Sequence, residues 1–127
     1  MKTPDKIARK VAVFVYGTLK KGFSNHHYLA NGNAAFVGKG VTKKRFALYA
    51  DIFPYVTPRE AVCHIHGEVY LVDKKTLERL DGLEEHPHWY KREKTWITLE
   101  DGREIETFIY FHYNPRGKLI PSGNYSQ

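Results

Sequence analysis

Unbroken apolar runs alternate along the chain with segments of helical spacing, and this pattern predicts the elements of the fold. Residues 11–16 are apolar at every position and rich in β-branched and aromatic side chains, which indicates a strand covered on both faces. Five further segments have the composition and alternation of strands: 34–38, 42–50, 61–72, 89–99 and 104–113. The Asp101-Gly102 pair between the last two predicts a hairpin.

Two helices are predicted between these strands. A short one is expected through Tyr28-Leu29-Ala30, capped by Ser24 or Asn25. A longer one begins at Asp73 and carries Leu77, Leu80 and Leu83 on one side. The proline-containing segment 51–60 and the tail 114–127 are expected to lack regular structure. The pattern as a whole predicts an α+β fold, a small mixed, mostly antiparallel β-barrel with flanking helices.

Length and composition indicate one globular domain. A chain of 127 residues with 42% hydrophobic and 14% aromatic residues can bury a single core, which we place at residues 11–127. Residues 1–10 hold several of the basic residues behind the net charge of +6 and are interpreted as a flexible extension. The sequence has no bilayer-length apolar run and no secretory signal, so we expect a cytoplasmic protein with no membrane partner.

Several function classes are disfavoured by the composition. The single cysteine, Cys63, lies in an apolar run and is expected to be a core residue. His64 and His66 share a strand face but have no third ligand at recognisable spacing, so no metal site is predicted. The chain has no RRM-type or helix-turn-helix motif, and no nucleic-acid partner is expected.

One acidic residue on the long helix has the position expected of a catalytic group. At roughly 100° per residue, Glu84 lies about 40° from the centre of the leucine stripe and Glu85 about 140° away. Glu84 therefore faces the core, where desolvation and the like charge of Asp81 should raise its pKa and suit it to general acid/base work. The structural alternative is that Glu84 only caps the helix or pairs with Arg79 or Arg92.

A glycine directly after the first strand has the position expected of an anion-binding loop. Gly17 allows a ligand to approach the backbone closely and leaves successive N–H groups free. A simple turn is the alternative at this position. The sequence has no Gly-x-Ser-x-Gly elbow, so Thr18 and Ser24 are interpreted as hydrogen-bond donors rather than nucleophiles.

Five short segments together resemble the γ-glutamylcyclotransferase-like family, and within it the γ-glutamylamine cyclotransferase or AIG2-like branch. They are Tyr16-Gly17-Thr18-Leu19-Lys20, Asn25-His26, Gly67-Glu68-Val69-Tyr70, Asp81-Gly82-Leu83-Glu84 and Tyr90-x-Arg92. The resemblance covers about residues 11 to 125 and implies a compact β-barrel with flanking helices. Residues 1–10 match nothing in the family.

The resemblance also implies an activity: an enzyme that converts a γ-glutamyl amide to 5-oxoproline and a free amine, without metal or cofactor. Glu84 matches the family's general acid/base glutamate. The positions that match substrate-binding residues are Tyr16, Gly17, Thr18, Leu19, Tyr90, Arg92 and Tyr125. The partner would be a small-molecule γ-glutamyl substrate. A non-catalytic small-molecule binding protein on the same fold is the alternative, and the amine portion and oligomeric state are left open.

Overall fold

The computed structural model describes residues 10–126 of the chain. Its helices are α2 (His27–Ala30) and α3 (Lys74–Leu83). Its strands are β1 (Val11–Val15), β2 (Ala35–Thr42), β3 (Ala47–Ala50), β4 (Pro54–Thr57), β5 (His66–Val72), β6 (Lys91–Leu99), β7 (Glu104–Phe111) and β8 (Lys118–Leu119). Except for Lys10, the predicted N-terminal extension lies outside the described residues. Neither helix has the length and apolar character needed to cross a membrane.

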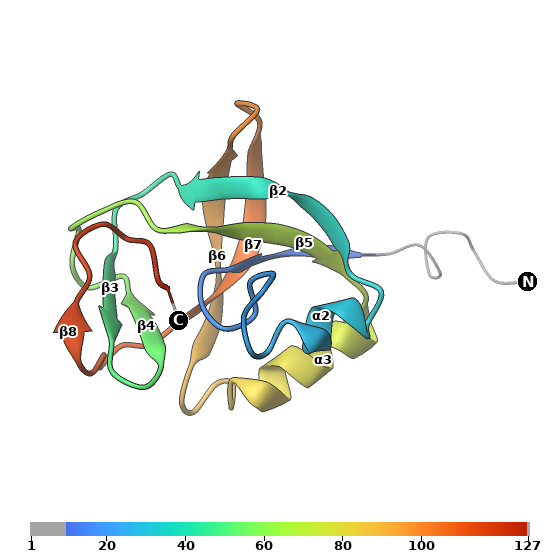
Figure 1. The fold of residues 1–127 in the computed structure, drawn as a ribbon, viewed down its shortest axis with the longest axis horizontal. Helices are drawn as coiled ribbons and strands as arrows, with labels where there is room; N and C mark the ends of the chain where they lie inside the picture. The colour runs from blue at the N-terminus through green and yellow to red at the C-terminus, as the bar shows by residue number, and fades with distance from the viewer. Residues whose placement is uncertain (1–9, 127) are drawn as a thin grey trace, which may run out of the picture.

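The architecture is a closed barrel joined to a small second sheet (Figure 1). The barrel has the strand order β1-β5-β2-β6-β7, and it closes where β7 pairs with β1 in parallel through Phe108 and Val13. All other pairs in the barrel are antiparallel. The second sheet has the order β4-β3-β8, and α2 contacts α3 beside the barrel (Figure 1). The predicted fold class, a mostly antiparallel barrel with flanking helices, is confirmed.

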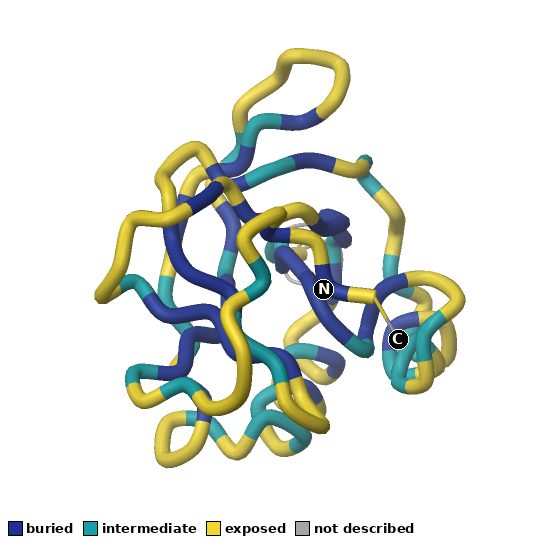
Figure 2. Tube along the Cα trace, turned by 60° about the vertical axis from the view of Figure 1, so that its left-hand side comes forward, coloured by how far each residue is buried: buried dark blue, intermediate teal, exposed yellow. Residues whose placement is uncertain are grey.

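Strand β1 is apolar throughout because it lies between two hydrophobic clusters. Successive side chains of a strand point to opposite faces. Phe14 packs in the cluster shared by the barrel and the second sheet, whereas Val13 and Val15 pack with Leu29 and Leu80 of the two helices. Figure 2 shows the resulting distribution, with buried segments gathered in the interior and exposed ones in the hairpin and loops. The prediction of a strand covered on both faces is confirmed.

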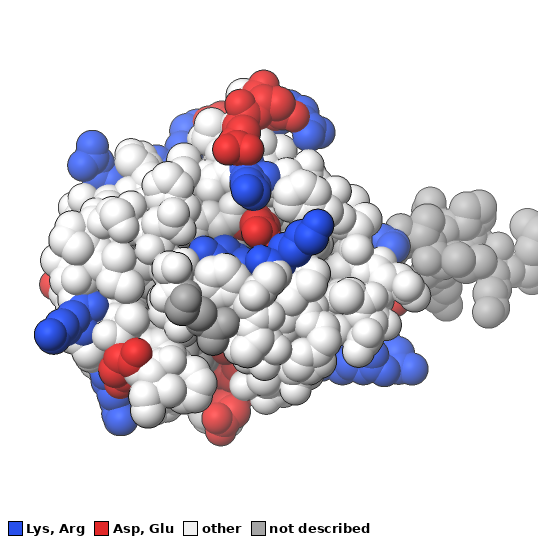
Figure 3. All heavy atoms as spheres, viewed as in Figure 1, with Lys and Arg blue, Asp and Glu red and all other residues white. Residues whose placement is uncertain are grey.

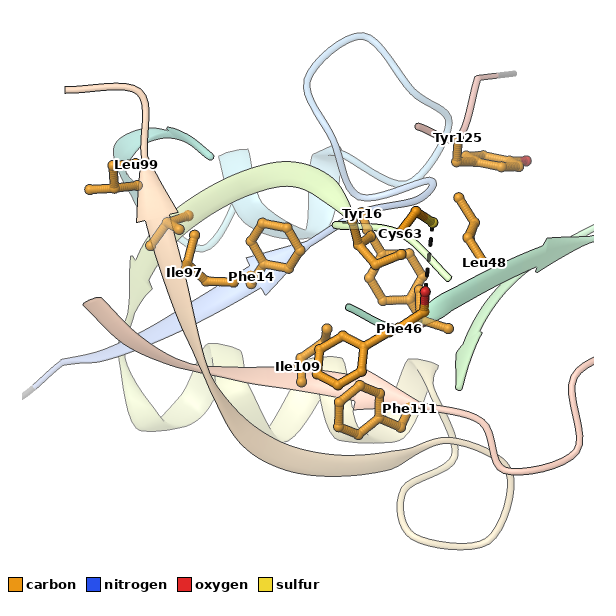
Figure 4. Close-up of a cluster of buried hydrophobic side chains, with 13 residues drawn as sticks. Phe14, Tyr16, Phe46, Leu48, Cys63, Ile97, Leu99, Ile109, Phe111 and Tyr125 are labelled. Carbon is orange, nitrogen blue, oxygen red and sulfur yellow. Dashed lines mark hydrogen bonds between the residues drawn. The ribbon is translucent and has the colours of Figure 1, made fainter. Parts of the chain in front are cut away.

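The single cysteine is a core residue, as the sequence predicts. Cys63 is buried in the same cluster as Phe14, and its Sγ atom lies 3.6 Å from the carbonyl oxygen of Phe46 (Figure 4). Burial raises the pKa of the Cys63 thiol, which keeps it protonated.

The strand boundaries between residues 34 and 72 differ from the predicted ones. One continuous strand, β2, occupies 35–42, and the expected strands over 42–50 and 61–72 are shortened to β3 and β5. The segment predicted to be irregular contains β4, which begins at Pro54. Proline is tolerated there because it is the first residue of an edge strand. The tail, also expected to be irregular, contributes the short strand β8, which pairs with β3.

The helix α3 begins as predicted, and its start is testable by mutation. The Asp73 carboxylate accepts a hydrogen bond of 2.7 Å from the backbone N–H of Thr76. Asp73→Ala should therefore lower the free energy of unfolding by about 1 kcal/mol. Urea unfolding measures this change. Glu78→Ala, at an exposed position of the same helix, serves as the control and should have a smaller effect.

Candidate active site

The loop that follows β1 is held in a defined shape by its own hydrogen bonds. The N–H of Lys20 donates to the carbonyl of Gly17 at 3.1 Å, closing a tight turn. Asn25 then binds Thr18 twice, through its backbone N–H to the Thr18 carbonyl and through its side-chain amide to the Thr18 hydroxyl, both at 2.8 Å. The ring Nδ1 of His26 lies 3.0 Å from the carbonyl of Leu19. The loop is therefore a preformed element.

This loop presents backbone donors that the protein itself does not use. In the part of the chain that the structure describes, the N–H groups of Gly17, Thr18 and Leu19 donate no hydrogen bond to another protein group. These three residues line a cavity. Successive free N–H groups at the edge of a cavity form a site suited to a carboxylate or an oxyanion.

Gly17 is required by close packing against the second sheet. A Cβ atom at this position would lie 2.5 Å from Cγ of Pro54, which is too close for a real contact. We expect Gly17→Ala to displace the loop and weaken substrate binding, seen as a raised KM in a steady-state assay. Gly82→Ala is the matched control, since a Cβ there meets no atom within 4 Å. An unchanged KM in Gly17→Ala would contradict a role of the loop in ligand binding.

Glu84 lines the same cavity as the loop. The helix α3 ends at Leu83, and Glu84 is its C-terminal cap residue, with its N–H donating to the carbonyl of Leu80 at 2.9 Å. Glu85 then takes a positive φ of 53° and is exposed to solvent. The backbone N–H of Tyr90 donates to the carbonyl of Glu84 at 3.1 Å. As predicted, Glu84 is the more buried of the two glutamates, although the exposed Glu85 also lines the edge of the cavity.

The cavity itself has a volume of about 140 Å³. It brings together two segments that are distant in sequence, the loop after β1 and the end of α3. Its lining comprises Phe14, Val15, Tyr16, Gly17, Thr18, Leu19, Asn25, Phe53, Pro54, Leu83, Glu84, Glu85, Trp89, Tyr90 and Tyr110. A cavity of roughly 150 Å³ holds one benzene ring. The space is thus suited to a group of the size of a glutamyl unit.

Burial alone raises the pKa of Glu84 to about 7. Although part of its surface remains open to the cavity, no described residue donates a hydrogen bond to its carboxylate. The expected contribution of Asp81 to this shift is not found, because Asp81 is neutralised by a salt bridge to Arg92 and a hydrogen bond of 2.7 Å from the Tyr110 hydroxyl. Arg92 therefore pairs with Asp81, and Glu84 stays available to a ligand.

The tyrosines around Glu84 form neutral walls of the cavity. The hydroxyl of Tyr16 donates to the carbonyl of Tyr110 at 2.6 Å, and that of Tyr90 donates to the carbonyl of Pro54 at 2.7 Å. Burial raises the pKa of Tyr16 and of Tyr90, and the Glu84 charge raises both further. Both tyrosines therefore stay protonated at neutral pH, where Glu84 titrates.

Two of the expected substrate-binding residues lie outside this cavity. Arg92 binds the end of α3: besides its salt bridge to Asp81, its backbone N–H donates to Nδ1 of His86 at 3.0 Å, and its guanidinium lies 4.7 Å from the Phe108 ring centroid. Tyr125 is buried in the core on the tail, where its carbonyl accepts a hydrogen bond of 2.7 Å from Nζ of Lys20. Arg92 thus positions the segment that carries Glu84, and Tyr125 anchors the tail to the loop.

Several residues that line the cavity were not identified as site residues from the sequence. Phe53 and Pro54 belong to the segment expected to be irregular, and Tyr110 lies on β7. Trp89 lies in the loop before β6. No local pattern identifies Phe53, Pro54 and Tyr110, because β4 and β7 reach the cavity through the pairing of strands that are distant in the sequence. Asn25 is the exception, since the Asn25-His26 segment forms part of the family resemblance.

The histidines considered as metal ligands do not converge. Nδ1 of His64 lies 2.7 Å from the carbonyl of Thr42. Within residues 10–126, no three His, Cys, Asp or Glu side chains are grouped so that they could hold a metal ion.

Comparison with known protein families gives a match over nearly the whole domain. The family model described as Gamma-glutamyl cyclotransferase, AIG2-like matches residues 13–127. A relative from Methanocaldococcus jannaschii, provisionally named a gamma-glutamylcyclotransferase, is 53% identical over 114 residues, covering 89% of this chain and 93% of that protein. The gamma-glutamylaminecyclotransferase of Bos taurus is 38% identical over 116 residues, covering 85% of this chain and 69% of that protein.

Solved structures agree with the family match. The crystal structure of an AIG2-like protein from Mus musculus superposes with a TM-score of 0.76 at 32% identity, covering 84% of this chain and 80% of that chain. A Pyrococcus horikoshii protein superposes with a TM-score of 0.72 at 33% identity, covering 90% and 88% of the two chains. The chain therefore belongs to the gamma-glutamyl cyclotransferase, AIG2-like family of enzymes.

Proposed function

We propose that this protein converts a γ-glutamyl amine to 5-oxoproline and the free amine, with Glu84 as the general acid/base. One observation carries the proposal: a carboxylate with a pKa of about 7 and no partner in the described protein lines the same small cavity as three residues with unused backbone N–H groups. A pKa near the working pH suits a group that must both accept and return a proton. The names of relatives such as the bovine protein support the same substrate class.

In the proposed mechanism, the Glu84 carboxylate removes a proton from the α-ammonium of the substrate. The free amine attacks the γ-carbonyl carbon of the same molecule, which forms a new C–N bond and a five-membered ring. The tetrahedral intermediate then collapses: the attacking nitrogen loses its second proton to water to give the lactam N–H, the original amide C–N bond breaks, and protonated Glu84 returns its proton to the departing amine. No nucleophile from the protein is needed, because a well-oriented intramolecular attack gains up to about 7–11 kcal/mol relative to a bimolecular one.

The loop Gly17 to Leu19 supplies the electrostatic part of this mechanism. Its free N–H groups hold either the α-carboxylate of the substrate or the oxyanion that develops on the γ-carbonyl oxygen. Tyr16 and Tyr90 close the cavity around the reacting atoms and exclude water. The other predicted substrate-binding residues, Arg92 and Tyr125, act through the segments that they hold in place.

The size of the cavity constrains how the substrate is bound. With about 140 Å³ of space, the cavity encloses the glutamyl unit, so the amine portion must extend towards solvent. Phe53 is 52% exposed and Trp89 is 36% exposed, and both line the cavity. These side chains offer an apolar rim to the carbon chain of the leaving amine.

The proposal is tested by incubating the protein with γ-glutamyl derivatives of alkyl amines, aryl amines and amino acids, and detecting 5-oxoproline and free amine by mass spectrometry. The N-acetyl form of each substrate is the control, since it lacks the attacking amine and should release nothing. Release of glutamate in place of 5-oxoproline would indicate hydrolysis and contradict the mechanism. Binding of the substrates without turnover would favour a non-catalytic binding protein.

A further inference from the structure

A second cavity, with a volume of about 650 Å³, lies at one end of the barrel. It is bordered by β2, β5 and β6, by the loop that contains Lys20 and Lys21, and by the tail. Its lining comprises Lys20, Lys21, Phe23, Lys39, Gly40, Val41, His66, Gly67, Glu68, Thr98, Leu99, Glu100, Asn124, Tyr125 and Ser126. The volume lies within the range of roughly 300–1,000 Å³ that is typical of ligand sites.

One of the two buried charges in this second cavity is a carboxylate with only one of its oxygens hydrogen-bonded. Glu68 is 8% exposed, and its Oε1 atom accepts hydrogen bonds of 2.9 Å from the Lys21 backbone N–H and from the Tyr70 hydroxyl. No described residue donates a hydrogen bond to its Oε2 atom. A carboxylate this deeply buried is stable only when its charge is compensated by hydrogen bonds or an opposite charge. One oxygen of Glu68 is therefore available to a donor from a ligand.

Lys21 and Lys39 line the same cavity as this carboxylate without forming a salt bridge to it. Lys39 is the cross-strand partner of Glu68 in the β2–β5 ladder, and Lys21 follows the turn beside it. Neither side chain forms a salt bridge within 4.0 Å to a described acidic residue. Figure 3 shows an acidic group in a hollow on this face, with basic side chains above and below it. Charges of both signs thus face one space: the buried Lys20 ammonium and the Glu68 carboxylate attract each other, and the exposed Lys21 and Lys39 side chains form no salt bridge among the described residues.

Lys20 has a different role, because it builds the wall of the second cavity. It is 8% exposed, and its Nζ atom donates to the carbonyl of Tyr125 at 2.7 Å and lies 4.7 Å from the Phe23 ring centroid. This joins the loop to the tail and places the Phe23 and Tyr125 rings side by side, 6.1 Å apart. The second cavity consequently has an apolar side as well as a charged one.

We propose that this second cavity binds a small zwitterion, an amino acid or ω-amino acid, with its ammonium on Glu68 and its carboxylate on Lys21 and Lys39. A purely anionic ligand would be repelled by the buried Glu68 charge, and a purely cationic one by the lysines. Only a molecule with both charges compensates both sets of groups. Phe23 and Tyr125 then contact the carbon chain between the two charges.

The second cavity shares a structural element with the first one. Gly17 to Leu19 line the first cavity, and Lys20, Lys21 and Phe23, which follow in the same loop, line the second. The backbone N–H of Lys21 donates a hydrogen bond to Glu68, so a ligand that binds Glu68 changes the environment of this loop. Backbone amide signals of the loop therefore report on occupancy of the second cavity.

NMR titration of the labelled protein tests this proposal, with 5-oxoproline present to fill the first cavity. Glycine, glutamate, 4-aminobutanoate and 6-aminohexanoate are added at millimolar concentration, with butanoate and butylamine as single-charge controls. At least one zwitterion should shift the amide signals of Lys21, Lys39 and Glu68, and the two controls should not. The proposal is overturned if no zwitterion shifts these signals, if shifts are confined to residues 16–19 and 84, or if butanoate binds equally well.

Two variants test the negative and the positive charges of the second cavity one at a time. Glu68→Gln keeps an oxygen that can accept from Lys21 and Tyr70, and Lys39→Ala changes only an exposed side chain. Each should weaken binding of the zwitterion by about ten- to a hundredfold, the effect of one hydrogen bond to a charged group. Lys44 is exposed and lines neither cavity, so the Lys44→Ala variant should bind the zwitterion as tightly as the wild type does. Unchanged affinity in both cavity variants would refute the proposal.

Discussion

Replacing Glu84 by glutamine should lower kcat/KM for release of 5-oxoproline by about 10²–10⁴-fold, the usual contribution of a general acid/base. The amide of glutamine fills the same space as the carboxylate but neither accepts the proton of the α-ammonium nor returns it to the leaving amine. Because the carboxylate has no hydrogen-bond donor among the described residues, the substitution breaks no contact in the fold. Steady-state kinetics with a γ-glutamyl amine measures the effect.

The matched control for this result is Glu78→Gln. Glu78 lies on the same helix, is exposed, and does not line the cavity, so kcat/KM should stay within about twofold of the wild-type value. Circular dichroism of both variants checks that the fold is retained. A folded Glu84→Gln protein that keeps substantial activity would show that another group moves the proton.

The stability of the protein should decrease as the pH rises from about 4.5 to about 7, with Glu84 as one cause. Burial raises the pKa of Glu84 from 4.5 to about 7, so over this interval the folded protein binds more protons than the unfolded chain does. Raising the pH therefore favours the unfolded chain. The free energy of unfolding falls by at most about 3 kcal/mol, and the decrease is complete above pH 7, where Glu84 is ionised in both the folded and the unfolded protein.

The contribution of Glu84 to this pH dependence is isolated by comparing the stability of the wild-type protein with that of the Glu84→Gln variant. The difference in the free energy of unfolding between the variant and the wild type should grow in favour of the variant from pH 4 to pH 8. Urea unfolding at a series of pH values measures this difference, and other titrating groups cancel in it. A difference that does not change with pH would mean that Glu84 has an ordinary pKa in the folded protein, and its proposed role at neutral pH would lose its basis.

Local sequence signals were sufficient where the cause of a structure is itself local. The apolar run 11–16 predicts β1, because neighbours on both faces must be hydrophobic. Asp73 and the leucine stripe predict α3, and the direction of Glu84 follows from the same helical spacing. The Asp101-Gly102 pair predicts the β6–β7 hairpin, where Gly102 takes the positive φ of 92° that its turn requires.

Predictions were wrong where pairing with a distant segment decides the structure. Strand β4 exists because its residues pair with β3, and its proline-containing sequence gave no sign of a strand. The assumed repulsion between Asp81 and Glu84 fails for the same reason, because β6 places Arg92 and β7 places Tyr110 against Asp81.

The sequence by itself determined the main strands, the helix that carries Glu84 and the inward direction of that side chain. It also identified the glycine loop, since each of these depends on the spacing and type of neighbouring residues. Only the tertiary structure decided that the loop and the glutamate line one cavity of about 140 Å³, that Pro54 and Tyr110 complete it, and that a second, charged cavity adjoins the same loop. The physical reason is that desolvation, which raises the pKa of Glu84, depends on every segment packed around the carboxylate.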